Sequence, residues 1–293
     1  MILKGIFAAS ASALKEDLSL DVNQTIFHAE NLIKNGCHNV ALLGSTGQAQ
    51  LLTIREKKEL INSASQSEFK DNFLIGTGLT SLRQNVDFMK HCINRGFKDF
   101  LLMNAPYYKY SDEGAFAFFS EIVNRVPECK IILYNFEKLS GYAFSIEVVE
   151  KLVKNFPKQI VGLKDSTYSI YEKLKIPNFS VFPGSETKLL RGLELGCSGI
   201  ISAICNVAAP LARKVYDDFL NKKKQTFNNK LCAVRQIFDK YNLISAVHTF
   251  LSAENPKFNR ILPPLRSLNK NEQKDLLTSL KKLNFIPEKN IAA

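Results

Sequence analysis

A single lysine near the end of a short apolar run is the residue of this sequence best suited to covalent chemistry. Residues 160–166 read IVGLKDS, and such a run is typical of a buried strand. A charged lysine is costly to bury, so Lys164 must pair with a carboxylate, reach solvent or lose its proton. Pairing with Asp165, or exposure to solvent, is one interpretation. The other is a neutral amine that forms a Schiff base with a carbonyl substrate.

Other polar groups directly follow other apolar runs. These groups are Gly44-Ser45-Thr46-Gly47, Pro106-Tyr107-Tyr108, Tyr134-Asn135 and Gly184-Ser185-Glu186. The first lacks the Gly-Lys ending of a nucleotide-binding loop, but a tight glycine turn before a helix can hold a carboxylate. Taken alone, Tyr134 could equally be a packed aromatic residue and Glu186 the first-turn acid of a helix.

Short apolar runs alternate with amphipathic stretches along the chain. The predicted strands are Gly5-Ser10, Asn39-Leu43, Phe73-Gly78, Asp99-Asn104, Lys130-Asn135, Ile160-Lys164, Phe179-Pro183 and Gly199-Ile204. The predicted helices between them are Asp21-Asn35, Thr53-Ser67, Ser81-Arg95, Asp112-Arg125, Ser145-Asn155 and Glu186-Leu195. Most open with Ser, Thr or Asp as an N-cap, and three end near glycine, at Gly36, Gly96 and Gly196.

This alternation predicts an α/β fold, a (β/α)₈ TIM barrel with a C-terminal helical extension. An open doubly wound sheet would show a G-x-G-x-x-G fingerprint after an early strand, and there is none. We expect residues 1–206 to supply the barrel strands and crossover helices. Residues 207–293 would supply a closing helix and the extension, packed as part of the same domain. The helices expected there are Ala208-Asn221, Gln225-Leu251 and Asn271-Leu283.

In such a barrel the catalytic residues lie at the carboxyl ends of the strands, so the polar groups above would surround one opening, the mouth of the barrel.

The composition of the chain narrows the possible functions further. The net charge of +11 is spread along the chain, which argues against a nucleic-acid surface. No apolar run approaches the ~18 residues of a membrane span, and the N-terminus lacks signal-peptide features, so we expect a cytoplasmic protein. The six cysteines and four histidines show no ligand spacing. We expect buried cysteines, no metal and no cofactor.

Together these motifs resemble the dihydrodipicolinate synthase / N-acetylneuraminate lyase family of class I, Schiff-base pyruvate aldolases. The resemblance covers essentially the whole chain. It is carried by the four groups named above, by Gly162-Leu163-Lys164-Asp165-Ser166, Gly199-Ile200-Ile201-Ser202 and Pro263-Pro264-Leu265. It implies a TIM barrel that assembles as a homo-oligomer, a dimer or a dimer of dimers.

The resemblance also implies roles for individual residues. Lys164 would form the imine with pyruvate, and Tyr134 would shuttle protons beside it. Ser45 would link Tyr134 to Tyr108 of a neighbouring subunit. Among the substrate-binding positions, Thr46 would hold the pyruvate carboxylate with nearby backbone N–H groups. The Ile201 carbonyl would line the pocket.

The loops that select the second substrate match no single branch of the family. Leu139 stands where the synthases carry an arginine for the second carboxylate, although Lys138 next to it could supply a cation. The lyases hold a polyhydroxylated tail with a pair of adjacent acidic residues. Here only one of the two is present, Glu186, and it is preceded by Gly184 and Ser185.

We therefore expect a metal-independent carbon–carbon lyase that acts on a hydroxylated 2-keto acid. A 2-keto-3-deoxy sugar acid or an N-acetylneuraminate-like compound is the expected substrate, with pyruvate as one product. A synthase that condenses pyruvate with aspartate semialdehyde is the alternative within the family. A dehydratase or hydratase acting through the same imine comes third. A non-catalytic barrel that binds a keto acid is an alternative from a different functional class.

Overall fold

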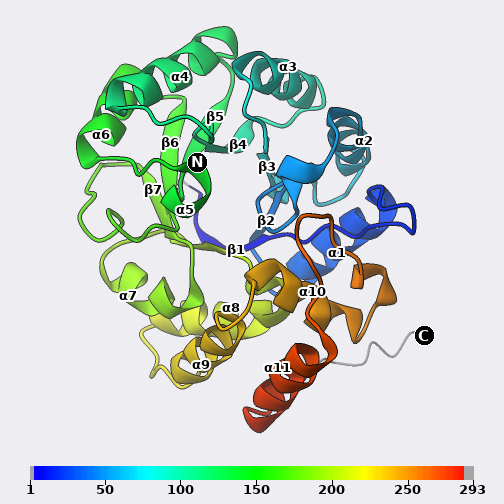
Figure 1. The fold of residues 1–293 in the computed structure, drawn as a ribbon. Coiled ribbons are helices and arrows are strands. Elements are labelled where there is room, and N and C mark those ends of the chain that lie inside the picture. The colour runs from blue at the N-terminus through cyan, green and yellow to red at the C-terminus, as the bar shows by residue number, and fades with distance from the viewer. Residues whose placement is uncertain (1–2, 287–293) are drawn as a thin grey trace.

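The computed structural model describes residues 3–286 and contains an eight-stranded parallel sheet that curls into a barrel (Figure 1). The sheet order is β7-β6-β5-β4-β3-β2-β1-β8. Its strands are β1 Gly5–Ala9, β2 Asn39–Leu42, β3 Phe73–Gly76, β4 Asp99–Met103, β5 Lys130–Asn135, β6 Ile160–Asp165, β7 Ser180–Pro183 and β8 Gly199–Ser202. The N–H of Ser198 donates to the carbonyl of Val181 at 2.8 Å, which brings β8 back beside β7. The predicted TIM barrel is confirmed; residues 1–2 and 287–293 of the predicted ranges lie outside the described residues.

Helices surround the barrel, and further helices follow the last strand (Figure 1). The helices are α1 Val22–Lys34, α2 Ile54–Ala64, α3 Leu82–Ile93, α4 Asp112–Arg125, α5 Glu137–Ser140, α6 Ile146–Asn155, α7 Leu189–Glu194, α8 Cys205–Leu220, α9 Asn228–Phe238, α10 Leu243–Ser252 and α11 Lys270–Lys282. Short 3₁₀ turns are η1 Ala49–Leu51, η2 Lys70–Asn72, η3 Glu186–Lys188 and η4 Pro256–Phe258. The short α5 was not predicted.

Local sequence signals explain where many of these helices begin and end. Side-chain oxygens accept a first-turn backbone N–H at Asp21, Thr53, Ser81 and Ser145. Such caps satisfy donors that have no partner within the helix. The predicted glycine stops adopt positive φ angles of 115°, 88° and 90°, at Gly36, Gly96 and Gly196. These angles are strained for residues that carry a Cβ atom.

One predicted helix is wrong. The stretch Gln225-Leu251 forms two helices, α9 and α10, because the chain turns at residues 239–242 and Asn242 caps α10 by accepting from the N–H of Ser245. Helix α8 also begins three residues before the predicted Ala208. Ala208 itself departs from helical angles just ahead of Pro210, which has no N–H to continue the ladder.

Two apolar layers form the core. One fills the barrel interior, with Phe7, Leu101, Ile132 and Phe182 among its fully or nearly fully buried members. The other packs the outer faces of the strands against the helices. Five of the six cysteines are buried and none is paired, which confirms the expectation of small apolar cysteines; Cys232 is half-buried.

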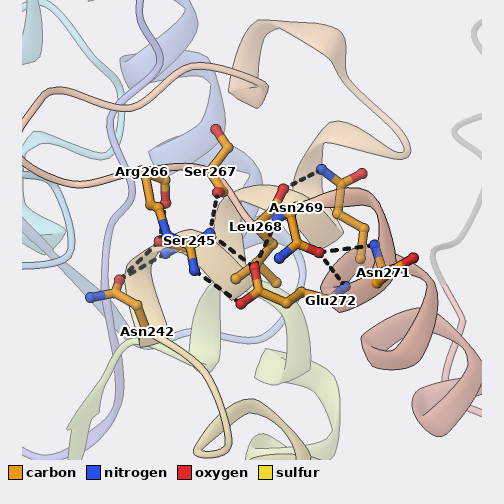
Figure 2. Close-up of polar contacts among 9 residues, drawn as sticks. Asn242, Ser245, Arg266, Ser267, Leu268, Asn269, Asn271 and Glu272 are labelled. Atoms are coloured by element: carbon orange, nitrogen blue, oxygen red, sulfur yellow. Dashed lines mark hydrogen bonds and ion pairs between the residues drawn. The ribbon is translucent and has the colours of Figure 1, made fainter.

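The C-terminal extension is held together by polar contacts around the start of α11 (Figure 2). Arg266 donates to both carboxylate oxygens of Glu272 at 3.0 Å, and Glu272 forms a capping box with Asn269. The hydroxyl of Ser245 on α10 donates to the Arg266 carbonyl at 2.7 Å. None of the helices between residues 3 and 286 combines the length and apolar character that crossing a bilayer requires.

Candidate active site

Lys164 lies inside the barrel near the carboxyl end of β6. It is paired in register with Tyr134 of β5, and only 5% of it is exposed. Its Nζ atom is 4.0 Å from the centroid of the Tyr134 ring. Within residues 3–286, no carboxylate lies within ion-pair distance of this amine. The structure thus brings together the two residues predicted to carry the chemistry.

Asp165 does not pair with Lys164. Its fully buried carboxylate accepts from the Asn135 side chain at 2.9 Å. It also accepts from four backbone N–H groups of the loop that follows, at Thr167, Tyr168, Ile170 and Tyr171. A buried carboxylate needs such a set of donors. Asp165 therefore shapes the loop after β6, a role that the sequence did not reveal. The interpretation that Lys164 forms an ion pair with Asp165 is wrong.

The glycine turn after β2 leaves two N–H groups available. Within the turn, Gly47 donates to the Gly44 carbonyl at 3.1 Å and Gln48 donates to the Ser45 carbonyl at 3.0 Å. The N–H groups of Ser45 and Thr46 have no acceptor among residues 3–286. A Cβ atom on Gly47 would lie 2.9 Å from a backbone carbonyl, so the close approach requires glycine. Two unused donors suit a carboxylate.

Gln48 anchors this turn to the C-terminal extension. Its Oε1 accepts from the N–H of Leu262 at 2.6 Å, and its Nε2 lies 3.5 Å from Nε2 of His248 on α10. The other ring nitrogen, Nδ1, lies 3.0 Å from the Phe258 carbonyl and must donate there, which leaves Nε2 as an acceptor. Burial lowers the pKa of His248 to about 4, so the ring is neutral at pH 7.

A cavity opens at the carboxyl ends of β2, β3 and β4. Its walls include Ser45, Thr77, Thr80, Asn104 and Tyr134, and its volume is about 20 Å³. Lys164 does not line it, but Tyr134 both lines the cavity and contacts the Lys164 amine.

Two polar groups of this cavity have no hydrogen-bond partner among residues 3–286. They are the hydroxyl of Ser45 and both atoms of the Asn104 amide, and all three atoms are buried. Asn104 was predicted only as the end of a strand. The rule that placed Ser45 and Tyr134 at the mouth would also have selected Asn104.

A buried lysine supports the wall of this cavity. The amine of Lys57 on α2 donates to the carbonyls of Thr77 and Gly78, at 2.9 and 3.0 Å. Burial lowers its pKa to about 8. Both of these acceptors are backbone oxygens, so Lys57 acts on the cavity through the loop after β3.

The tyrosine pair after β4 projects outward. Tyr107 and Tyr108 are 89% and 74% exposed, with ring centroids 5.0 Å apart, and Tyr107 has a strained φ of 94°. Because the Ser45 hydroxyl has no partner among residues 3–286, the predicted link from Tyr134 through Ser45 to Tyr108 is not formed within this part of one subunit. The role of Tyr108 across two subunits stays a prediction.

Glu186 lies on the opposite side of the mouth and is fully buried. Its carboxylate accepts from Arg235 at 3.0 Å, from the Ser202 hydroxyl at 2.8 Å and from the Cys205 thiol at 3.4 Å. Arg235, on α9, also donates to Asp239 at 2.8 Å. Burial opposes the charge of Arg235, but the two carboxylates outweigh it and raise the pKa of the guanidinium.

The remaining predicted binding residues lie on several elements. A Cβ atom on Gly184 would lie 2.1 Å from the Ser166 hydroxyl oxygen, so only glycine fits there. The Ser185 hydroxyl lies 3.0 Å from that of Thr187, and Ile201 is buried inside the barrel. Lys138 and Leu139 are exposed on α5. Their roles, like that of Glu186, stay predictions.

Within residues 3–286, no three His, Cys, Asp or Glu side chains are grouped in a way that could hold a metal ion.

The barrel and its mouth match one family over nearly the whole chain. The model of the dihydrodipicolinate synthetase family matches residues 2–283, and the chain belongs to this family of lyases and aldolases. The chain is 26% identical to the 4-hydroxy-tetrahydrodipicolinate synthase of Methanothrix thermoacetophila, over 96% of this chain and 98% of the relative.

Solved structures of similar fold are known. YagE, a prophage protein of Escherichia coli K12 crystallised with pyruvate, has a TM-score of 0.90 and 24% identity, covering 97% of this chain and 100% of that one. The dihydrodipicolinate synthase of Agrobacterium tumefaciens has a TM-score of 0.87 and 25% identity, covering 96% and 99%.

Proposed function

We propose that this protein is a metal-independent carbon–carbon lyase that acts through an imine on Lys164. It releases pyruvate from a hydroxylated 2-keto acid, or forms that acid from pyruvate and an aldehyde. The observation that carries the proposal is a buried lysine amine that has no carboxylate partner among residues 3–286 and lies against the ring of Tyr134. A lysine amine in such a position can attack a carbonyl carbon and form a Schiff base. The pyruvate complex of YagE, a protein of the same fold, is consistent with this assignment.

The residues of the mouth suit each step. The amine of Lys164 attacks the pyruvate carbonyl carbon, and loss of water gives the protonated imine. The N–H groups of Ser45 and Thr46 can hold the pyruvate carboxylate. Removal of a methyl proton yields an enamine, whose terminal carbon attacks an aldehyde. Tyr134 supplies a proton to the new hydroxyl oxygen, and hydrolysis of the imine releases the product. Cleavage is the same sequence in reverse.

A second subunit would complete the proton path in this proposal. Ser45 lacks a partner and Tyr108 is largely exposed, so a Tyr108 hydroxyl from another copy could meet Ser45. Such a contact requires a homo-oligomer, either a dimer or a dimer of dimers.

Borohydride trapping tests the imine directly. The protein is incubated with pyruvate and borohydride, and intact mass and peptide mapping locate the reduced adduct. We expect one reduced pyruvyl group on Lys164 and none in Lys164→Met. Lys57→Met is the matched control because Lys57 is also a buried lysine, and this variant should keep the adduct. An adduct on another lysine, or none in the folded protein, would refute the proposal.

The synthase alternative rests on the cation beside Leu139. Lys138 is exposed on α5 and could meet the carboxylate of aspartate semialdehyde. Turnover of the pyruvate-loaded protein with aspartate semialdehyde, but not with glyceraldehyde, would favour the synthase. Formation of the adduct with no turnover of any aldehyde would favour the keto-acid-binding barrel.

A further inference from the structure

We propose that one extra residue in β6 turns Lys164 into the barrel, and that Gly162 and Asn135 are the positioning residues that hold this arrangement. This inference rests on the proposed imine at Lys164 and concerns how the strand presents that amine to Tyr134. The pairing of β5 with β6, which carries the inference, shifts by one residue partway along the two strands.

The shift lies between two neighbouring pairs of residues. Ile131 of β5 pairs with Ile160 of β6. The next residue of β5, Ile132, pairs with Gly162. Val161 is therefore the extra residue of a β-bulge and is left without a partner on β5. Bulges are common next to active sites, where they re-aim a side chain.

The side chains of β6 show the same shift. Ile160 and Leu163 both pack in the outer apolar layer, although they are three positions apart. Side chains of a regular strand alternate between its two faces, so residues on one face are an even number of positions apart. Tyr134 lies in the barrel interior, and beyond the bulge Lys164 faces it there.

Without the extra residue, Lys164 would lie on the other face of the sheet. If the pairing before the bulge continued unbroken, Tyr134 would pair with Leu163 instead of Lys164. A slip of one residue moves every side chain of a strand to the opposite face. The amine would then lie on the outer side of the sheet, where it could not meet a substrate in the mouth.

Gly162 allows the bulge to fit against the next strand. A Cβ atom at this position would lie 2.6 Å from the carbonyl oxygen of Ser180 on β7. Real Cβ atoms do not come so close, and a backbone carbonyl cannot swing aside as the end of a flexible side chain can. Any larger residue must therefore push β6 away from β7 two residues before Lys164.

A hydrogen bond between two fully buried side chains fixes the register beyond Lys164. Asn135 pairs with Asp165, the next pair after Tyr134 and Lys164, and its amide donates to the Asp165 carboxylate at 2.9 Å. The Asn135 oxygen accepts from the N–H of Phe144 at 3.1 Å. Neither side chain of this bond is exposed, so Asn135 acts on the reaction through the position of the strands.

The test compares two glycine variants by the rate at which borohydride traps pyruvate on Lys164, measured on folded protein well below Tm. Gly162→Ala should lower this rate at least about tenfold, because a misplacement of about 1 Å can cost 10²-fold. Gly5→Ala is the matched control. Gly5 opens β1 at the amino end of the barrel, and a Cβ atom there would lie 2.5 Å from the His38 ring. Both variants should lower Tm, but Gly5→Ala should keep the trapping rate of the parent.

Asn135→Asp is a second variant that changes less of the packing. It keeps the shape of the side chain and the oxygen that accepts from Phe144, but it replaces the donor to Asp165 with a carboxylate oxygen. Two facing carboxylates repel each other, so the trapping rate should fall here too. Adding Asp165→Asn removes the repulsion and lets an amide donate in the opposite direction. The double variant should therefore recover part of the trapping rate that Asn135→Asp loses.

Two results would overturn the inference. Equal losses of trapping rate in Gly162→Ala and Gly5→Ala would mean that trapping follows general stability and not the register of β6. Trapping at the parent rate in both Gly162→Ala and Asn135→Asp would mean that neither residue places the amine of Lys164. In that case the adduct persists and the proposed function stands, whereas a parent protein that forms no adduct would refute the proposed function as well.

Discussion

On the side of the mouth formed by β2, β3 and β4, the buried Ser45 hydroxyl and Asn104 amide have no partner within residues 3–286. On the side formed by β6, β7 and β8, the buried carboxylates of Asp165 and Glu186 accept five and three hydrogen bonds. The two sides of the mouth thus differ in how far their buried polar groups are satisfied within residues 3–286, and we call the first the open side and the second the closed side. Unsatisfied buried groups are tolerated where function uses them.

The comparison predicts that substitutions on the two sides will affect different properties. On the open side they should change rates and selectivity with little loss of stability. On the closed side they should change the free energy of unfolding.

The largest expected effect is on the rate, from Tyr134→Phe. Losing a general acid/base group should lower kcat by roughly 10²- to 10⁴-fold, while borohydride trapping on Lys164 should persist. Steady-state kinetics and thermal unfolding are both measured. Tyr216→Phe makes the same change at a buried tyrosine on α8, beside His38, and should leave kcat unchanged. If Tyr134→Phe instead lowered Tm sharply at unchanged kcat, Tyr134 would be a structural residue with no part in proton transfer.

The next largest effect is on stability, from Arg235→Met. Removing one partner of a buried ion pair leaves the other charge uncompensated, which costs about 3–5 kcal/mol. Urea unfolding should show this loss, and adding Glu186→Gln to Arg235→Met should restore part of it. Arg213→Met is the matched control: Arg213 also pairs with an aspartate four residues on, but at the surface, so its loss should be under ~1 kcal/mol. Similar losses in both variants would contradict the contrast between the two sides.

The sequence predicts some residues of the site but not the partners that hold them. Lys164, Tyr134 and Ser45 could be placed at one mouth because each directly follows or ends an apolar run, and parallel strands bring such ends together. The partners of Glu186 and Gln48 could not be predicted. Arg235 is 49 residues from Glu186, and Leu262 is 214 residues from Gln48. Periodicity identifies the buried face of a helix but not the residue that this face meets.

The support of the turn after β2 should also respond to acid. The turn after β2 is anchored through Gln48 to His248, and His28 on α1 lies against the same aromatic ring, that of Phe258. Burial lowers the pKa of both histidines to about 4. In the unfolded chain a histidine has a pKa of about 6.5. Between these values the unfolded state binds more protons, so stability is complete above about pH 6.5 and falls as the pH is lowered toward 4.

Gln48→Glu sharpens this prediction and gives the smallest effect. The carboxylate still accepts from the N–H of Leu262, but it no longer offers an N–H to Nε2 of His248. The ring can then bond to residue 48 only by gaining a proton, so its pKa should rise. The loss of stability with acid should become shallower than in the parent, where it amounts to at most about 1.4 kcal/mol per pH unit for each histidine. Urea unfolding at several pH values and NMR titration of the His248 ring measure both changes. The His28 titration should move less than that of His248, because its ring bonds to Asn206 and feels His248 only through space. An unchanged His248 titration in Gln48→Glu would mean that the 3.5 Å contact does not hold the turn, and that the open side is anchored through Leu262 alone.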